Sequence, residues 1–193
     1  MYESEVKGSG AYQWGTYSTH QFILLNHNNT LNSVFTIAHE MGHAMHSYYT
    51  HKNEPFVYGN NTLFVAEVAS TCNEALLSHY LLQEKDDRKK KLYLLNHQLE
   101  GFRGTVFRQT MFAEFEKIIH NNSENQIPLT VESLSNIYHE LNIKYYGPDI
   151  VVDPLIDLEW ARIPHFYSSF YVYKYAIGFS TAAALSAKLL KGD

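Results

Sequence analysis

The chain has 193 residues, enough for one domain with a sizeable core, of which 45% are hydrophobic and 18% charged. This composition is typical of a globular protein and excludes a disordered one. The net charge of −5 does not favour nucleic-acid binding, and the basic cluster at residues 88–91 is expected to be a solvated helix start. No apolar run approaches the ~20 residues that cross a bilayer.

The chain has one cysteine, Cys72, so no internal disulfide can form. Cys72 is expected to be a small core residue of a helix rather than a nucleophile. Because residues 1–10 are polar and acidic, no secretory signal is expected, and a reducing, cytoplasmic setting fits.

The predicted elements form a mainly helical protein with a small β-sheet near the N-terminus. Aromatic and apolar residues between glycines predict a hairpin or two edge strands within the first 30 residues. From Ser33, a plausible N-cap, apolar residues recur at three- and four-residue steps and predict a helix to about Tyr49. A loop is expected at residues 50–61. Four more helices are expected at residues 62–83, 86–120, 130–146 and 167–190, the second of these interrupted or bent near Gly101 and Gly104, and residues 147–164 are expected to be mostly irregular.

Residues 39–43, His-Glu-Met-Gly-His, match the metal-binding pattern H-E-x-x-H. On a helix, residues four apart differ by about 40° in rotation and about 6 Å in rise, so His39 and His43 can reach one ion. Glu40 lies on the adjacent strip of the helix, where it can reach a water molecule beside the metal and act as general base. The pentapeptide alone is not decisive, but it lies in a strongly periodic helical segment.

A catalytic zinc ion needs a third protein ligand and one open position. If the loop between the first two helices allows antiparallel packing, His43 and Glu67 lie at nearly the same depth, about 9 Å and 7.5 Å from that loop. Glu67 is therefore the expected third ligand, and Glu54 in the loop is its rival. Glu74 shares the face of Glu67 and can orient a ligand histidine.

Other histidines offer weaker metal sites. His46, three residues past His43, and His51, in the loop that follows, could bind metal adventitiously. His139 and Glu140 repeat the first half of the motif, but Ile143 stands at the second ligand position, so this pair is expected to be structural or solvated.

The segments around the motif resemble the oligoendopeptidase F family, bacterial relatives of thimet oligopeptidase and neurolysin. The similar segments span nearly the whole chain, at residues 7–12, 24–26, 39–49, 64–71, 164–167 and 170–176. The resemblance implies a mainly helical metallopeptidase that cuts short peptides inside a deep channel. It also implies one zinc ion held by His39, His43 and Glu67, with Glu40 as base.

Members of the family are several times longer, with a large helical region before the motif that forms part of the channel. Residues 1–193 are therefore expected to be a single catalytic domain, a fragment whose missing partner is that region. The family places a histidine and tyrosines of the C-terminal segment at the substrate. His165, Tyr171 and Tyr173 are the candidates, and Tyr167 would share a helical face with Tyr171.

Two other functions stay open at this stage. A zinc carboxypeptidase would need a basic partner for the terminal carboxylate, and Arg103, Arg108 and Arg162 are available. A metal-stabilised helical module without catalysis would not need Glu40, because structural sites use no base. Cobalt or manganese could replace zinc, and an extended peptide could add to the early strands around residues 8–12.

Overall fold

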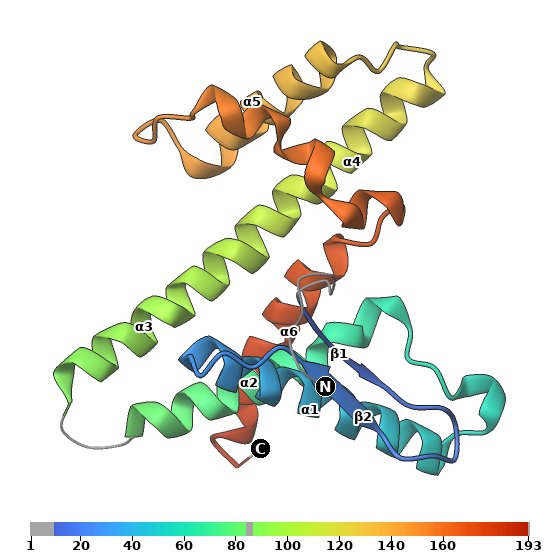
Figure 1. The fold of residues 1–193 in the computed structure, drawn as a ribbon, viewed down its shortest axis with the longest axis vertical. Coiled ribbons are helices and arrows are strands. Elements are labelled where there is room, and N and C mark those ends of the chain that lie inside the picture. The colour runs from blue at the N-terminus through green and yellow to red at the C-terminus, as the bar shows by residue number, and fades with distance from the viewer. Residues whose placement is uncertain (1–9, 84–86, 193) are drawn as a thin grey trace. The chain divides into compact units, whose positions relative to one another are not determined.

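The computed structural model describes residues 10–83 and 87–192, which are mainly helical with one small sheet, as predicted (Figure 1). The chain divides into two compact units, residues 1–98 with 178–193 and residues 99–177. One catalytic domain over residues 1–193 stays a prediction. In the part of the chain that the structure describes, no helix is both long and apolar enough to cross a membrane.

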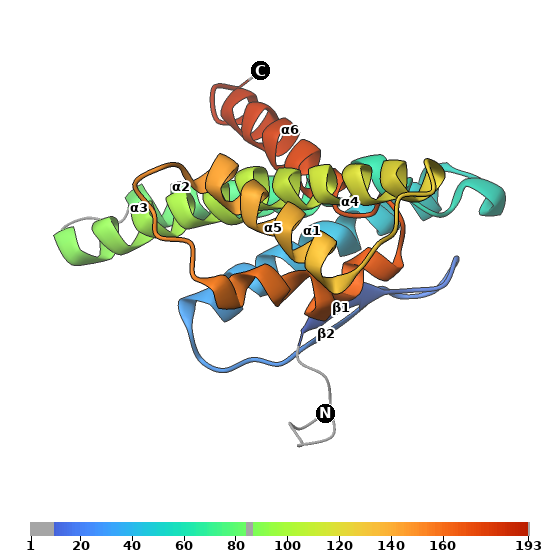
Figure 2. The same cartoon turned by 90° about the horizontal axis from the view of Figure 1, so that it is seen from above.

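The two strands come first along the chain, and the helices follow them. In order they are β1 (Ala11–Trp14), β2 (Phe22–Leu25), α1 (Leu31–Asn53), α2 (Ala66–Gln83), α3 (Arg88–Phe102), α4 (Arg108–Glu124), α5 (Val131–Tyr146) and α6 (Tyr173–Leu189). The predicted hairpin is confirmed: β1 and β2 pair antiparallel, with Ala11 opposite Leu25 and Trp14 opposite Phe22. Both views show this hairpin beside α1 (Figures 1 and 2).

Helix α1 is longer at both ends than predicted. Its N-cap is Thr30 and not Ser33, because the Thr30 hydroxyl accepts a hydrogen bond from the Ser33 backbone N–H at 3.3 Å. Ser33 instead donates its hydroxyl to Asn28 Oδ1 at 2.5 Å. At the other end, Asn53 and Thr50 donate side-chain hydrogen bonds to carbonyls one turn earlier. The backbone N–H of Glu54, the C-cap residue, donates to the Thr50 carbonyl oxygen at 2.8 Å, which pairs one of the last four carbonyls that a helix end otherwise leaves without a partner.

The backbones of α1 and α2 approach closely at Gly42, in the middle of the metal motif. A Cβ atom there would lie 2.5 Å from Ser70 Cα and 2.8 Å from the Ala69 carbonyl oxygen. One turn away, Asn73 Nδ2 donates to the Ala38 carbonyl oxygen at 2.6 Å. Backbone atoms cannot rotate aside, so only glycine allows this packing. The motif face of α1 is thereby held against α2.

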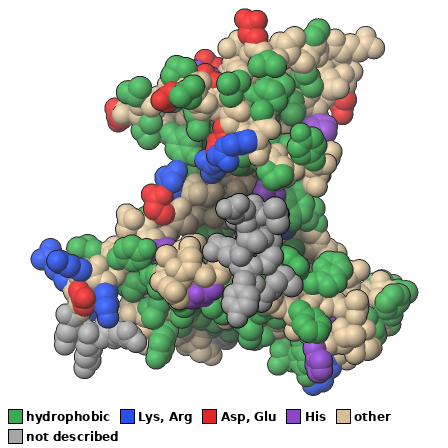
Figure 3. Space-filling view, viewed as in Figure 1, with side chains coloured by type: hydrophobic (Ala, Val, Ile, Leu, Met, Phe, Trp, Pro, Cys, Tyr) green, Lys and Arg blue, Asp and Glu red, His purple; other side chains and the backbone are tan. Residues whose placement is uncertain are grey.

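The start of helix α3 is exposed to solvent, as predicted. Residues 88–91 are exposed, and basic side chains gather at this end of the helix (Figure 3). The Asp87 carboxylate accepts hydrogen bonds from the backbone N–H groups of Lys89 and Lys90. The acidic residues before it, Glu84 and Asp86, lie outside the described residues.

The helix predicted at residues 86–120 is interrupted near Gly101 and Gly104, as expected, by a π-helical segment, Arg103–Phe107, between α3 and α4. Gly104 lies within it, and a Cβ atom there would meet nothing within 4 Å. Space for a side chain is therefore available at this glycine, unlike at Gly42.

The second unit is built on α4 and α5, with Thr130 capping α5 as predicted. Its core consists of apolar and aromatic residues, Met111, Phe112, Phe115, Tyr138, Leu141, Ile163 and Val172. The buried Glu159 carboxylate accepts hydrogen bonds from the Tyr138 hydroxyl at 2.7 Å and from Arg108 at 2.6 Å, and it also pairs with Arg162. These hydrogen bonds and ion pairs compensate the free-energy cost of burying the Glu159 carboxylate.

The last helix starts at Tyr173 and not at Tyr167, which corrects the prediction. Pro164–Tyr167 is a 3₁₀ turn, and Phe170 has a φ of +56°, which no right-handed helix accepts. The Phe170 backbone N–H donates to Glu116 Oε1 of α4 at 2.9 Å. A buried side chain therefore takes the place of a helical carbonyl as acceptor.

We predict that Gly42→Ala destabilises the chain by about 1–3 kcal/mol or more, because the added methyl group would overlap backbone atoms of α2. Urea unfolding followed by circular dichroism measures this change. The matched control is Gly104→Ala, which adds the same methyl group in open space and should leave stability equal or higher. Equal stability of the two variants would contradict the packing described.

Candidate metal centre

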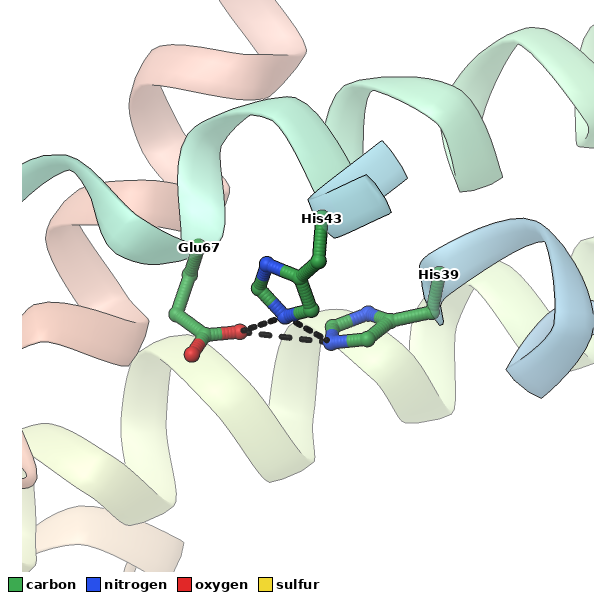
Figure 4. A group of neighbouring side chains, drawn as sticks. All are labelled: His39, His43 and Glu67. Atoms are coloured by element: carbon green, nitrogen blue, oxygen red, sulfur yellow. Dashed lines mark hydrogen bonds and ion pairs between the residues drawn. The ribbon is translucent and has the colours of Figure 1, made fainter. Parts of the chain in front are cut away.

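Three side chains from two helices point at one another, as the sequence predicts. His39 and His43 come from α1 and Glu67 from α2 (Figure 4). The two Nε2 atoms are 3.1 Å apart, and Glu67 Oε2 lies 3.3 Å from His39 Nε2 and 3.7 Å from His43 Nε2. Among the described residues, these three offer a group of donors close enough to hold a metal ion.

The three donors fit a zinc-sized ion. Bonds of 2.0–2.1 Å arranged as a tetrahedron separate neighbouring ligand atoms by about 3.3–3.4 Å. The observed separations of 3.1, 3.3 and 3.7 Å bracket that value. Imidazole and carboxylate donors also suit zinc, and three ligands leave one of four positions for a reactant.

Glu74 orients the first histidine, as predicted. Its Oε1 lies 2.5 Å from His39 Nδ1. An ionised carboxylate can only accept, so His39 Nδ1 is the donor in this contact, and Nε2 is the ring nitrogen that faces Glu67. The rival ligand Glu54 lies exposed as the C-cap of α1 and does not belong to the donor group.

Glu67 is held at the centre by close packing on both sides. Its side chain is buried, and a Cβ atom on Gly178 of α6 would lie 2.7 Å from Glu67 Cβ. A buried carboxylate needs a positive partner. Burial alone would lower the pKa of His39, but hydrogen bonds to Glu67 and Glu74, together with their charges, raise it from 6.5 to about 10.

Glu40 lies beside the donor group without joining it. The carboxylate is buried, and Oε2 has no hydrogen-bond partner among the described residues. Burial raises the Glu40 pKa, partly offset by the charge of His39 and by the backbone N–H of Gln13 in β1. A pocket of about 290 Å³ is lined by both Glu40 and His39, and also by Glu74 and His97. The carboxylate is thus a strengthened base facing a cavity.

The other histidines and the cysteine stay outside this group. His46 is half-buried, and burial lowers its pKa, while His51 Nδ1 contacts Gln21 Nε2 at 3.2 Å. His139 Nδ1 pairs with Asp157 at 2.8 Å, which is a structural contact as expected. Cys72 is half-buried in α2, and burial raises the pKa of its thiol, so the thiolate is disfavoured.

The remaining candidates lie in the second unit. The ring of His165 is 5.7 Å from Tyr171 and 6.1 Å from Tyr175, and the two tyrosine rings are 5.8 Å apart. Tyr173 begins α6 and is half-buried, and Tyr167 is 90% exposed. Sequence reasoning missed Tyr175, although it stands four residues after Tyr171. Action of His165, Tyr171 and Tyr173 on a substrate stays a prediction.

The whole chain, residues 1–193, matches the sequence profile of peptidase family M3. The chain belongs to this family. Oligopeptidase PepF of Bacillus subtilis is 58% identical over 191 residues, which are 99% of this chain and 28% of that protein. The chromosomal oligoendopeptidase F of Lactococcus lactis subsp. cremoris is 51% identical over 191 residues, 99% of this chain and 32% of that protein.

The fold also matches a solved member of the family. The crystal structure of oligoendopeptidase-F from Enterococcus faecium superimposes with a TM-score of 0.70 and 50% identity, over 84% of this chain and 29% of that one. The chain therefore spans less than a third of the length of these relatives.

We predict that Glu74→Gln weakens zinc binding about 10–100-fold, because the amide no longer offers His39 a charged acceptor. Glu67→Ala should weaken binding more, since it removes a donor. Competition with a chromogenic chelator measures both affinities. Glu54→Gln is the matched control and should bind zinc like the parent; a loss there equal to that of Glu67→Ala would make Glu54 the ligand.

We predict that zinc binding at pH 7.5 releases about one proton, since His39 is protonated in the metal-free chain and must lose its proton to bind. Zinc affinity should therefore rise between pH 6 and pH 9. The raised pKa also means that the His39 contacts stabilise the metal-free fold below pH 6.5, a contribution lost as pH rises through about 10. Calorimetry in buffers of different ionisation enthalpy counts the protons, and a count of zero would refute the assignment.

Proposed function

We propose that this chain forms the catalytic part of a zinc-dependent endopeptidase that cuts internal bonds of short oligopeptides. The observation that supports this most is the buried Glu40 carboxylate beside three donors at zinc-ligand spacing, His39, His43 and Glu67. The names of the relatives, oligopeptidase and oligoendopeptidase F, support the substrate class.

The chemistry divides between the ion and the residues around it. When bound, zinc acts as a Lewis acid toward the scissile carbonyl and lowers the pKa of water towards ~7. Glu40 accepts the proton of the attacking water and then delivers it to the leaving amine. Its raised pKa favours the first transfer, because a stronger base accepts the proton more readily.

The developing oxyanion needs a hydrogen-bond donor from the protein. Tyr171 and Tyr173 carry hydroxyl donors, and His165 carries a ring donor. The loss of one such donor typically costs ~10²–10³ in rate. The His165 ring packs on Tyr171, so this pair can act on one substrate group.

An extended peptide could add to the edge of β1 through main-chain hydrogen bonds. The strand β1 carries the Gln13 N–H that reaches Glu40, so a peptide on this strand would run past the base. Residues 8 and 9, included in the expected docking segment, lie outside the described residues.

The carboxypeptidase alternative has less support. The three arginines available to bind a terminal carboxylate already pair with acids in their own unit: Arg103 with Glu100, and Arg108 and Arg162 with Glu159. In a non-catalytic metal-stabilised module the buried Glu40 carboxylate would have no role, because structural metal sites use no base. A cytoplasmic location, and zinc in preference to cobalt or manganese, stay predictions.

We predict that Glu40→Gln abolishes cleavage of a quenched fluorescent peptide while zinc content stays at the parent level. The amide keeps the shape of the side chain but cannot take a proton. The assay uses the zinc-loaded chain and, in parallel, B. subtilis oligopeptidase PepF with this chain in place of its 191 matching residues. Glu54→Gln is the control and should cleave normally.

Cleavage by the Glu40→Gln protein at the parent rate would remove Glu40 from the mechanism. Mass spectrometry of the products separates the two peptidase hypotheses, since an endopeptidase leaves internal fragments and a carboxypeptidase releases single residues from the C-terminus.

A further inference from the structure

The side chain of Gln13 in β1 makes contacts with α1 that the mechanism above does not use. Its Oε1 atom accepts a hydrogen bond from the Ser47 hydroxyl of α1 at 3.3 Å. Both side chains are half-buried. The backbone N–H of the same Gln13 donates to the Glu40 carboxylate. Gln13 therefore contacts α1 at two points, and one of them is the proposed base.

The two points of contact lie on one face of α1. Ser47 follows Glu40 by seven residues, which is close to two helical turns, so both side chains project from the same side of the helix. Strand β1 contacts α1 in the structure, and both ribbon views show the hairpin beside this helix (Figures 1 and 2). The contacts of Gln13 therefore fix where β1 lies along α1, and with it the position of its N–H at Glu40.

A chain of hydrogen bonds fixes the orientation of the Gln13 amide. Since Oε1 accepts from Ser47, Nε2 is the donor end of the amide, and it donates to Gln21 Oε1. Gln21 Nε2 then faces His51 Nδ1 of α1 at 3.2 Å. A Cβ atom on Gly15 would lie 2.8 Å from Gln21 Cδ, so the glycine leaves room for this amide. Turning the Gln13 amide over would place two carbonyl oxygens against each other, so one orientation is specified.

The orientation of the Glu40 carboxylate depends on the Gln13 N–H. Glu40 is buried, and its Oε2 has no hydrogen-bond partner among the described residues. A donor fixed on a carboxylate determines its rotation, while the oxygen without a partner stays available to take a proton. Proton transfer requires the base to be within hydrogen-bond reach, and a misplacement of about 1 Å can cost about 10²-fold in rate.

We propose that Gln13 is a positioning residue that orients the Glu40 carboxylate for proton transfer in the peptidase reaction. Its side chain fixes β1 against α1, and its backbone N–H is thereby held at Glu40. The proposal rests on the function proposed above and adds the residue that acts through the base. All the residues involved belong to one compact unit, the unit that contains residues 1–98.

The test measures kcat, KM and zinc content of B. subtilis oligopeptidase PepF carrying this chain in place of its matching segment. Gln13→Met removes both amide hydrogen bonds at nearly constant length, and Ser47→Ala removes only the bond to α1. We expect Gln13→Met to lower kcat at least about 10-fold, with KM changed less than about twofold and zinc content unchanged. Ser47→Ala should lower kcat by a smaller factor. The double variant should match Gln13→Met, because Ser47 then has no amide to hold.

Gln98→Met is the matched control. Gln98 also donates its amide to a serine hydroxyl within the same unit, that of Ser78 at 2.7 Å, but this bond joins α3 to α2 and not β1 to α1. It should leave kcat unchanged. If Gln98→Met lowers kcat as much as Gln13→Met does, the loss reflects packing in general and the proposal fails.

Ser47→Thr keeps the hydroxyl and should restore the kcat that Ser47→Ala loses. If Gln13→Met does not fold, these two variants decide, since each changes one contact of β1 and leaves Gln13 in place. A fall in kcat at parental KM and zinc content, restored by Ser47→Thr, supports the proposal. Parental kcat in the variants overturns it, and so does loss of zinc, because Gln13 would then act on the metal ligands.

The function itself is judged separately by Glu40→Gln. Parental kcat in Gln13→Met beside an inactive Glu40→Gln would sink the role of Gln13 while leaving the peptidase intact. Full cleavage by Glu40→Gln would instead remove the base on which the role of Gln13 depends.

Discussion

The metal centre depends on how closely two helix backbones can approach. Gly42 stands between the two histidines of the motif, and backbone atoms of Ser70 and Ala69 occupy the space that any side chain there would need. This contact sets the distance between α1 and α2, and so the distance from both imidazoles to Glu67. The donor separations of 3.1 to 3.7 Å follow from it. A larger residue would push the two helices apart and lengthen the distances between Glu67 and the two imidazoles.

The same packing of α1 against α2 brings charged side chains together at the metal centre. Two carboxylates, Glu67 and Glu74, converge on His39 in a poorly solvated place, which attracts a cation as strongly as it attracts a proton. Glu40 is buried next to them but faces the pocket, so its basicity is raised without its being drawn into the ligand set. Helix α1 thus carries two of the three donors, His39 and His43, together with the proposed base, Glu40, whose environment differs from theirs although it directly follows His39.

Much of the site could be predicted from the sequence because it depends on local geometry. The spacing of His39 and His43, the face shared by Glu67 and Glu74, and the order of the helices all follow from helical periodicity. The start of α6 could not be predicted in this way. Tyr167 to Tyr175 looks periodic, but the buried Glu116, more than 50 residues earlier, accepts the Phe170 N–H and stops the helix from starting earlier. A tertiary contact overrode the local pattern.

Tyr175 was missed for the same reason, since its ring contact with Tyr171 depends on the turn that precedes the helix.

The central claim is that two imidazoles and one carboxylate bind a single zinc ion. X-ray absorption at the zinc edge of the loaded protein tests it most directly. We expect one zinc ion per chain with two nitrogen donors of imidazole and one carboxylate oxygen near 2.0–2.2 Å, plus one light-atom donor from solvent. A shell containing sulfur, a third imidazole, or solvent oxygens alone would contradict it.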